Sequence, residues 1–288
     1  ISSAKFWMEC GIDGFRLDHV IGHGMDCWVE FQAALEAVNP EVATIGEATD
    51  TGDALRRYHG RISGVLDFPI ARALRLTFGT GDWSLAELDN FLDLYDDYMT
   101  PGPARVGFLD NHDMDRFLYV AGQDRTALAL AALCMLTLPQ TPVIYYGTEI
   151  GMSHTASTSD RERGGDALAR QDMEWDRQRW DGDLQRLFGE LIRFRRGATD
   201  AVQGRRMRVH LDSAAQTYAY GLSEGDEQPG EGEEQFVVVF NLADDTREVP
   251  LALSGEQVLT TGPDVGMKEN SLTVPGRTGA IIRRTYLR

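Results

Sequence analysis

Hydrophobic positions in the first two-thirds of the chain alternate between short apolar runs and longer stretches with helical spacing. The short runs are bounded by Gly, Pro or Asp, which is typical of strands buried on both faces, and they cover residues 12–17, 42–46, 65–68, 105–109 and 142–146. Helical spacing predicts helices over residues 25–38, 53–58, 85–98, 126–136 and 184–196. Strands that alternate with helices predict an α/β fold with a parallel sheet.

The pattern changes from about Met207 to short apolar runs separated by turn residues, without a helical period. These runs predict antiparallel strands at residues 217–222, 235–241, 248–253, 257–260 and 279–284. We therefore expect two domains, residues 1–202 and residues 203–288. Residues 221–234 are rich in Gly and Glu and are expected to form a loop.

The first residues have the pattern of a helix end. Residues 2–10 are amphipathic, and Gly11 stands where the first residue after a helix takes a left-handed conformation. Position 1 is not Met. A chain that opens inside a helix favours a segment upstream of this sequence.

The composition is that of a soluble globular protein, with 42% hydrophobic and 25% charged residues among 288. A formal net charge of −17 disfavours nucleic acid and anionic membranes as partners. Of the 28 basic residues only Lys5 and Lys268 are lysines, which fits either a salt-rich medium or a GC-rich genome. No apolar stretch reaches the roughly 20 residues of a membrane span, and no signal peptide is evident. Both a cytoplasmic and a secreted location are compatible with the sequence.

The three cysteines, Cys10, Cys27 and Cys134, lie far apart in the sequence. An odd number at such spacing predicts neither a disulfide framework nor a metal cluster. We expect buried free thiols.

Acidic residues follow three of the predicted strands, namely Asp18, Glu47 and Asp113. The carboxyl ends of parallel strands meet at one edge, so these side chains are expected to converge. Folding alone gives no reason to collect carboxylates that repel one another. Retaining glycoside hydrolysis does, because it needs a nucleophilic carboxylate and a carboxylic acid about 5–5.5 Å apart.

The neighbouring residues suggest individual roles. Arg16 and Asp18 are two apart on a strand and share a face, so the guanidinium would keep Asp18 ionised as a nucleophile. Glu47, crowded by other carboxylates, would hold a proton and donate it to the leaving oxygen. His112 and Asp113 could bind sugar hydroxyls and stabilise positive charge. Taken singly, these residues also fit plainer roles, such as a helix N-cap, an ion-pair partner or a structural histidine.

Three segments, residues 11–18, 45–47 and 108–113, resemble consecutive signature regions of the α-amylase family, glycoside hydrolase family 13. Residues 142–149 resemble its eighth-strand segment. Asp166 and Arg170, followed by Met173 and Trp175, resemble a stretch of its oligosaccharide-acting members of the cyclomaltodextrinase, neopullulanase and α-glucosidase type. Five such motifs in order are specific.

The resemblance implies strands 4–8 of a (β/α)8 TIM barrel, followed by an all-β antiparallel sandwich. The first three strands of the barrel do not appear in the sequence. Five strands of eight would leave two unpaired edges. The chain is therefore expected to be a fragment or a split subunit, with a missing N-terminal barrel half on the same polypeptide or a separate chain. The isolated chain can lack activity for this reason.

The resemblance also implies the site. Asp18 would be the nucleophile and Glu47 the acid/base, with Asp113 as transition-state stabiliser; the substrate contacts would be Arg16, His112, Asp166 and Arg170. His19 and the two residues after it depart from the family pattern, which puts the usual calcium link in doubt. We predict no metal site in this chain, with Ca²⁺ a candidate only in the complete protein.

The implied activity is retaining hydrolysis of α-glucosidic bonds in starch-type glucans or maltooligosaccharides. Two alternatives stay open. One is an α-glucan transglycosylase or phosphorylase that uses the same residues. The other is a non-catalytic relative that acts only in interactions, although such relatives usually lack one or more of the three carboxylates.

Overall fold

The computed structural model of the chain describes residues 1–204, 206–225, 235–251 and 254–285. Contacts along the backbone divide it into two units. The first unit contains Ile1–Arg72, Phe91–Phe108 and Gln140–Val143, and the second contains Ala73–Asn90, Leu109–Pro139 and Ile144–Arg288. The expected domain boundary between residues 202 and 203 stays a prediction.

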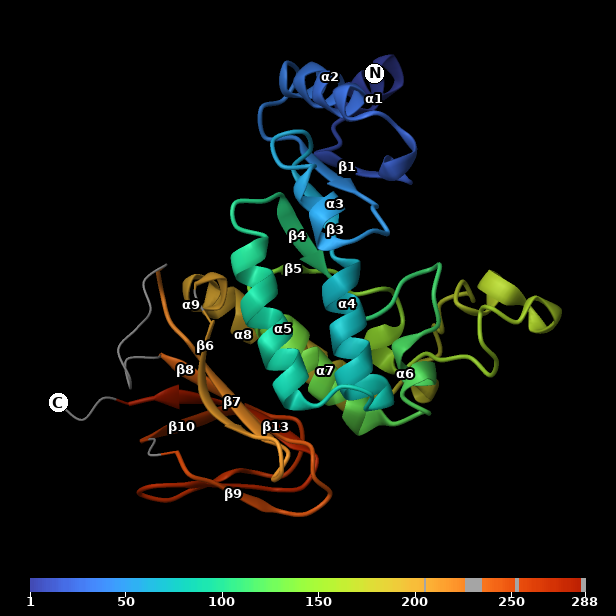
Figure 1. Cartoon of the computed structure of the whole chain (residues 1–288). Coiled ribbons are helices and arrows are strands. Elements are labelled where there is room, and N and C mark those ends of the chain that lie inside the picture. The colour runs from blue at the N-terminus through green and yellow to red at the C-terminus, as the bar shows by residue number, and fades with distance from the viewer. Residues whose placement is uncertain (205, 226–234, 252–253, 286–288) are drawn as a thin grey trace. The chain divides into compact units, whose positions relative to one another are not determined.

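The first unit holds a parallel sheet whose strand order follows the chain (Figure 1). Its strands are β1 (Gly14–Leu17), β2 (Ala43–Gly46), β3 (Gly64–Leu66), β4 (Ala104–Gly107) and β5 (Thr141–Pro142). All neighbouring pairs are parallel, so the predicted α/β alternation is confirmed. Of the strand predicted over 142–146 only Pro142 lies in a strand, as the last residue of β5, and β3 ends before Phe68, where a helix begins.

The prediction that the strands are buried on both faces was wrong for β1. Only Leu17 is buried in this strand, and Arg16 is exposed. The cause is the position of β1, which among the described residues pairs with β2 alone. The pairing itself is close: a Cβ at Gly14 would lie 2.2 Å from the Ala43 carbonyl oxygen, so glycine is required there.

The helices of the first unit are α1 (Ser2–Glu9), α2 (Met25–Glu36) and α3 (Gly52–Arg56). The end of α1 is as predicted, because Gly11 has φ +97° and its N–H donates to the Met8 carbonyl at 2.9 Å. Met8 packs with Leu35 and Val42 in a small core between α1, α2 and the start of β2.

The helix α4 (Phe68–Leu74) and the π-helical turn that continues it (Arg75–Thr80) were not predicted from the sequence. Pro69 lies in the first turn of α4, where its missing N–H costs no helical hydrogen bond. By contrast, α5 (Leu85–Tyr98) covers the range that its apolar spacing predicted.

The remaining helices belong to the second unit and are α6 (Phe117–Val120), α7 (Arg125–Thr137), α8 (Gly182–Gly197) and α9 (Thr199–Gln203). Short 3₁₀ turns lie at Val20–Gly22, Thr148–Ile150, Arg161–Arg163, Gly165–Leu168 and Arg177–Arg179. Asp124 and Asp181 cap α7 and α8, each accepting two backbone N–H bonds. Every residue of α7 from Ala127 to Thr137 is buried. No helix in the described part of the chain is long and apolar enough to cross a bilayer.

Two antiparallel sheets occupy the end of the chain. The larger has the order β10 (Gly255–Thr260), β13 (Thr278–Arg284), β8 (Phe236–Asn241), β7 (Thr217–Leu222) and β6 (Arg206–Asp212), and the smaller has β11 (Gly266–Met267), β12 (Leu272–Val274) and β9 (Arg247–Val249). One cluster of buried side chains, including Val239, Ile282 and Leu272, draws on both sheets. The predicted antiparallel region is therefore confirmed, with β6, β11 and β12 in addition.

Two predicted ranges at this end reach residues outside the described ones. Most of the predicted loop, 226–234, lies there, and its first two residues belong to β7. The strand predicted over 248–253 is shorter, since β9 ends at Val249 and residues 252–253 also lie outside.

A buried ionic network ties α5 to the larger antiparallel sheet. Asp89 accepts from Arg206 at 2.7 Å, from Arg208 at 2.9 Å and from the Tyr218 hydroxyl at 2.6 Å. Both oxygens of Asp89 are thus paired, which compensates the loss of its hydration.

A second buried carboxylate lies in the first unit. Asp67 Oδ1 accepts from the Ile70 N–H and from the Tyr95 hydroxyl, both at 3.1 Å, while Arg105 Nε is 4.0 Å from Oδ2. Burial outweighs these contacts and raises the pKa of Asp67 to about 6.

Asp67→Asn should therefore flatten the pH dependence of unfolding. The pKa of Asp67 in the folded chain, about 6, lies above its ordinary value of 3.8, so its contribution to stability is fully present below about pH 4 and is lost as the pH rises through 6. The loss should be about 3 kcal/mol. Urea unfolding between pH 4 and pH 7 measures it, with the exposed Asp26→Asn as the matched control. A wild-type profile parallel to that of Asp67→Asn would contradict this account.

Candidate active site

The sheet register places the first two predicted carboxylates side by side. Arg16 lies on β1, Asp18 follows β1 directly, and Glu47 follows β2 directly. The strands are parallel with Leu17 opposite Gly46, and the Glu47 N–H donates to the Leu17 carbonyl at 2.8 Å. Both side chains therefore leave the same end of neighbouring strands.

Arg16 bridges these two carboxylates. Its Nη1 donates to Asp18 Oδ1, and its Nη2 lies 2.6 Å from Glu47 Oε1. The planar guanidinium suits this task because its N–H groups point in fixed directions. The expected contact between Arg16 and Asp18 is present, and the guanidinium reaches Glu47 as well.

The two carboxylates differ in exposure. The side chain of Asp18 is 80% exposed, whereas that of Glu47 is 12% exposed. The hydrogen bond and the charge of Arg16 hold the pKa of Asp18 below its ordinary value, and a hydrogen bond with Glu47 acts in the same direction. Asp18 is thus open to solvent and held in its ionised form.

Backbone geometry fixes Glu47 from the other side. His19 has φ +45°, a left-handed backbone conformation that residues other than Gly rarely adopt. Its N–H donates to Glu47 Oε2 at 3.2 Å. The Val20 N–H donates to the Glu47 carbonyl at 3.0 Å, and the indole of Trp28 donates to the Val20 carbonyl. Glu47 has a guanidinium as its ion-pair partner, and the Asp18 carboxyl lies within hydrogen-bonding reach of it; crowding by further carboxylates stays a prediction.

A second cluster, in the second unit, gathers His112, Asp113 and Arg170. His112 Nε2 lies 3.0 Å from Asp113 Oδ2, and Arg170 Nη2 donates to Asp113 Oδ1. Arg170 Nε also donates to the His112 carbonyl at 3.0 Å. Direct contacts thus join three of the predicted site residues. Two of them, Asp113 and Arg170, are 57 positions apart in the sequence.

Residues that the sequence analysis did not select support this cluster. Arg116 is buried, lies 4.1 Å from the ring of Tyr145 and 4.9 Å from that of Tyr146, and donates to the Tyr146 carbonyl. The two tyrosine hydroxyls donate to the carbonyls of Ala169 and Gln171, on either side of Arg170. The two tyrosines at 145–146, within the segment that resembles an eighth strand, were the available signal.

Asp110 anchors the loop before the cluster. It is buried and accepts from the Phe117 N–H at 2.8 Å and from the Thr148 hydroxyl at 2.7 Å. Burial raises the pKa of Asp110. Its role is structural, which separates it from the exposed Asp113 three residues later.

Asp166 is not joined to this cluster. Its side chain is exposed in the 3₁₀ turn Gly165–Leu168, and only its backbone carbonyl contacts Arg170, whose N–H donates to it at 3.3 Å. Trp175, which follows in the same motif, is 77% exposed.

Each contact described above lies within one unit. The Arg16–Asp18–Glu47 cluster belongs to the first unit, and the His112–Asp113–Arg170 cluster belongs to the second. Convergence of all three carboxylates stays a prediction.

The described residues contain no group of three or more His, Cys, Asp or Glu side chains arranged to hold a metal ion. A calcium ion in the complete protein stays a prediction. Cys134 is a buried free thiol as expected, and burial raises its pKa to about 12. Cys10 and Cys27 are exposed, which corrects the expectation that all three thiols are buried. Cys10 is the C-cap residue of α1, and Cys27 lies in the first turn of α2.

Comparison with known proteins identifies the family of this chain. Residues 1–186 match the family model described as the alpha amylase catalytic domain. This chain belongs to the α-amylase family. It is 30% identical to alpha-amylase 2 of Dictyoglomus thermophilum over 213 residues, and 32% identical to neopullulanase 2 of Thermoactinomyces vulgaris over 248. These matches cover 74% and 82% of the chain but only 38% and 40% of the relatives.

The fold agrees as well. The crystal structure of an Anoxybacillus α-amylase superposes with a TM-score of 0.80 at 23% identity, and the match covers 99% of this chain and 62% of that one. At this identity the likeness concerns the fold alone. The chain therefore spans about two-fifths of the length of the two relatives named above, and 62% of the chain in that crystal structure.

Arg16→Gln should raise the pKa of Asp18, because the bridging guanidinium provides the largest stabilisation of its charged form. A ¹³C NMR titration of the Asp18 carboxyl measures the change directly. Arg57→Gln removes an exposed charge from the same unit and should leave the Asp18 titration unchanged. Equal Asp18 titrations in wild type and Arg16→Gln would show that the bridge does not hold Asp18 ionised.

Proposed function

We propose that the chain is the catalytic carboxyl-terminal portion of a retaining glycoside hydrolase that cleaves α-glucosidic bonds in starch-type glucans or maltooligosaccharides. One observation carries the proposal: the Arg16 guanidinium lies between Asp18 and Glu47 at the ends of adjacent parallel strands. The names of the relatives, α-amylase and neopullulanase, support the substrate class.

In the first step, a carboxylate oxygen of Asp18 bonds to the anomeric carbon while the bond to the leaving oxygen breaks. That oxygen takes the proton of Glu47. In the second step, Glu47 takes a proton from water, whose oxygen attacks the anomeric carbon and releases Asp18. Two displacements on one carbon retain its configuration.

Arg16 gives this sequence an electrostatic rationale. Asp18 loses its negative charge when the glycosyl bond forms, and Glu47 gains one in the same step. A guanidinium in contact with both carboxylates stays paired with a negative charge before and after the transfer. Proton donation by Glu47 requires that its pair with Arg16 loosens when substrate binds.

The second cluster supplies the other proposed roles. Asp113 stabilises the positive charge that develops on the sugar ring, while Arg170 and His112 hold its two oxygens in place. His112 and Arg170 are also proposed to contact sugar hydroxyls, with Asp166 as a further contact. The exposure of all four side chains supports contact with a substrate.

We further propose that the parallel sheet is strands 4–8 of a (β/α)8 barrel and that the antiparallel sheets form a sandwich. Among the described residues β1 and β5 each pair with one neighbour, and Phe6 and Trp7 of α1 are exposed. Three further strand–helix units would cover these edges. The longer relatives are consistent with such a segment, on the same polypeptide or a separate chain.

Asp18→Asn should abolish sugar release from maltotriose and soluble starch, by about 10⁴-fold or more in kcat, because the nucleophile is lost. Asp13→Asn, at the opposite end of β1, is the matched control and should retain activity. The assay uses the chain alone and the chain fused to the first three strand–helix units of a relative. Proton NMR of the first product should show the α-anomer.

Activity that survives in Asp18→Asn, after contamination and deamidation are excluded, would contradict the mechanism. Full activity of the chain alone would contradict the need for further strands. Glucosyl transfer to added maltose in preference to water would favour the transglycosylase alternative. Repeating the assay in molar salt tests whether the acidic, lysine-poor surface reflects a salt-rich medium.

A further inference from the structure

We propose that a groove in the second unit, lined by Trp83, Thr77 and Gln216, is an additional carbohydrate-binding site that takes a short stretch of an α-glucan chain. Its volume is about 560 Å³, within the usual range for small-molecule sites. None of its lining residues belongs to the two carboxylate clusters. The α-glucan as ligand rests on the proposed function, whereas the carbohydrate class rests on the groove itself.

One wall of the groove is a rigid turn between α4 and α5. The π-helical turn Arg75–Thr80 ends at Gly81, which has φ +74°, and the Trp83 N–H returns to the Leu76 carbonyl at 3.1 Å. Ser84 and Glu87 then cap α5 reciprocally, with the Ser84 N–H 2.7 Å from Glu87 Oε2. The half-buried Trp83 is thereby held at the groove by structure on both sides. π-Helical turns occur frequently at functional sites.

Another part of the lining comes from the antiparallel region and has unusual backbone geometry. Gln216, in the β6–β7 turn, has φ +56°, and Arg277, before β13, has φ +50°. Such conformations are uncommon for residues other than Gly and gather at ligand sites. The Gln216 carbonyl accepts from the Leu242 N–H at 2.9 Å, which fixes the turn while the side chain stays exposed.

A buried polar atom in the groove has no partner. Thr77 is 3% exposed, and its Oγ1 has no hydrogen-bond partner. Buried hydroxyls are nearly always hydrogen-bonded. The atom is covered by protein atoms in this structure, so a ligand hydroxyl could supply the missing bond only after the lining of the groove shifts.

The charges of the groove exclude most other ligands. Asp82, Glu87 and Asp124 are acidic, and the one cation among the described lining residues, Arg277, is paired with Asp124. This surplus of negative charge disfavours anions such as phosphate. The described residues contain no group arranged to hold a metal ion, and Glu87 is engaged in capping Ser84.

What remains is a neutral ligand with many hydroxyls and an apolar face. A pyranose ring has both: its C–H face can lie on the Trp83 indole, and its hydroxyls can pair with the amide of the exposed Gln216 side chain.

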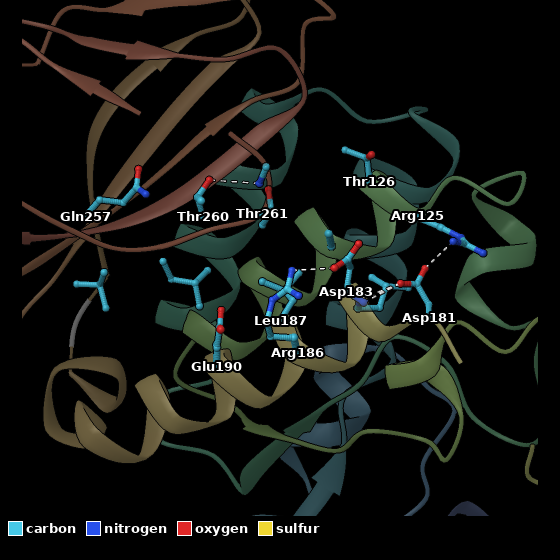
Figure 2. Close-up of a pocket in the computed structure, with 15 residues that line it drawn as sticks. Arg125, Thr126, Asp181, Asp183, Arg186, Leu187, Glu190, Gln257, Thr260 and Thr261 are labelled. Carbon is cyan, nitrogen blue, oxygen red and sulfur yellow. Dashed lines mark hydrogen bonds and ion pairs between the residues drawn. The ribbon is translucent and has the colours of Figure 1, made fainter. Parts of the chain in front are cut away.

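A second groove of similar size lacks the aromatic lining that a sugar ring would require. It lies beside α7, α8 and β10 and measures about 580 Å³ (Figure 2). None of its 15 lining residues is aromatic. Its arginines are paired within the groove, Arg125 with Asp181 at 2.9 Å and Arg186 with Asp183 at 2.8 Å. A substitution in this second groove therefore serves as the control for substitutions in the groove around Trp83.

The test is affinity electrophoresis of the full chain through gels that contain amylopectin, with calorimetric titration by maltoheptaose. Trp83→Ala should weaken polysaccharide binding at least tenfold, and Gln216→Gly, which suits the left-handed backbone, about threefold. Arg186→Ala, in the groove of Figure 2, should bind as wild type does. Circular dichroism verifies that each variant is folded, and Gln216→Gly keeps the test valid if Trp83→Ala does not fold.

Hydrolysis separates this site from the catalytic one. Turnover of maltotriose should be unchanged in Trp83→Ala and Gln216→Gly, while binding of amylopectin falls. If the amylopectin gel retains folded Trp83→Ala and Gln216→Gly as strongly as it retains the wild type, the proposal is wrong. It is also wrong if these variants lose maltotriose hydrolysis to the same extent as they lose amylopectin binding. If a gel with a β-linked glucan retains the chain in a Trp83-dependent way and an amylopectin gel does not, the α-glucan assignment is wrong. Trp83-dependent retention by amylopectin in a chain without hydrolytic activity would support this site and count against the proposed function.

Discussion

One guanidinium, that of Arg16, connects the fold of this chain to its proposed chemistry. It can contact Asp18 and Glu47 together only because β1 and β2 are parallel and in a register that ends both strands at the same level. Gly14 permits the close approach of the strands, and the left-handed His19 turns its N–H toward Glu47. The main features of the first unit thus converge on placing two carboxylates around one cation.

The arrangement also explains how carboxylates of similar intrinsic acidity can take different roles. Asp18 is open to solvent and held ionised, whereas Glu47 is enclosed and held by both oxygens. A similar arrangement occurs in the second unit, where Arg170 and His112 each contact one carboxylate oxygen of Asp113. In both clusters a cationic or polar partner fixes the direction of a carboxylate before substrate arrives.

Much of this could be predicted from the sequence, because periodicity and strand-end residues are local signals. The α5 range, the helix end at Gly11 and the parallel strand order needed only spacing and turn residues. The exposure of Arg16 did not follow, because it depends on which strands neighbour β1. The support of the second cluster by Arg116 and the tyrosines, and the groove around Trp83, join segments that are distant in sequence. No local pattern encodes such contacts.

The most direct test of the account is to identify the residue that becomes glycosylated. A fluorinated glucosyl fluoride that forms the covalent intermediate faster than it is hydrolysed would be reacted with the active form of the chain, and the peptides analysed by mass spectrometry. The account predicts a glycosyl adduct on Asp18, absent from Asp18→Asn. An adduct on Glu47 or Asp113, or an inverted first product without any adduct, would contradict it.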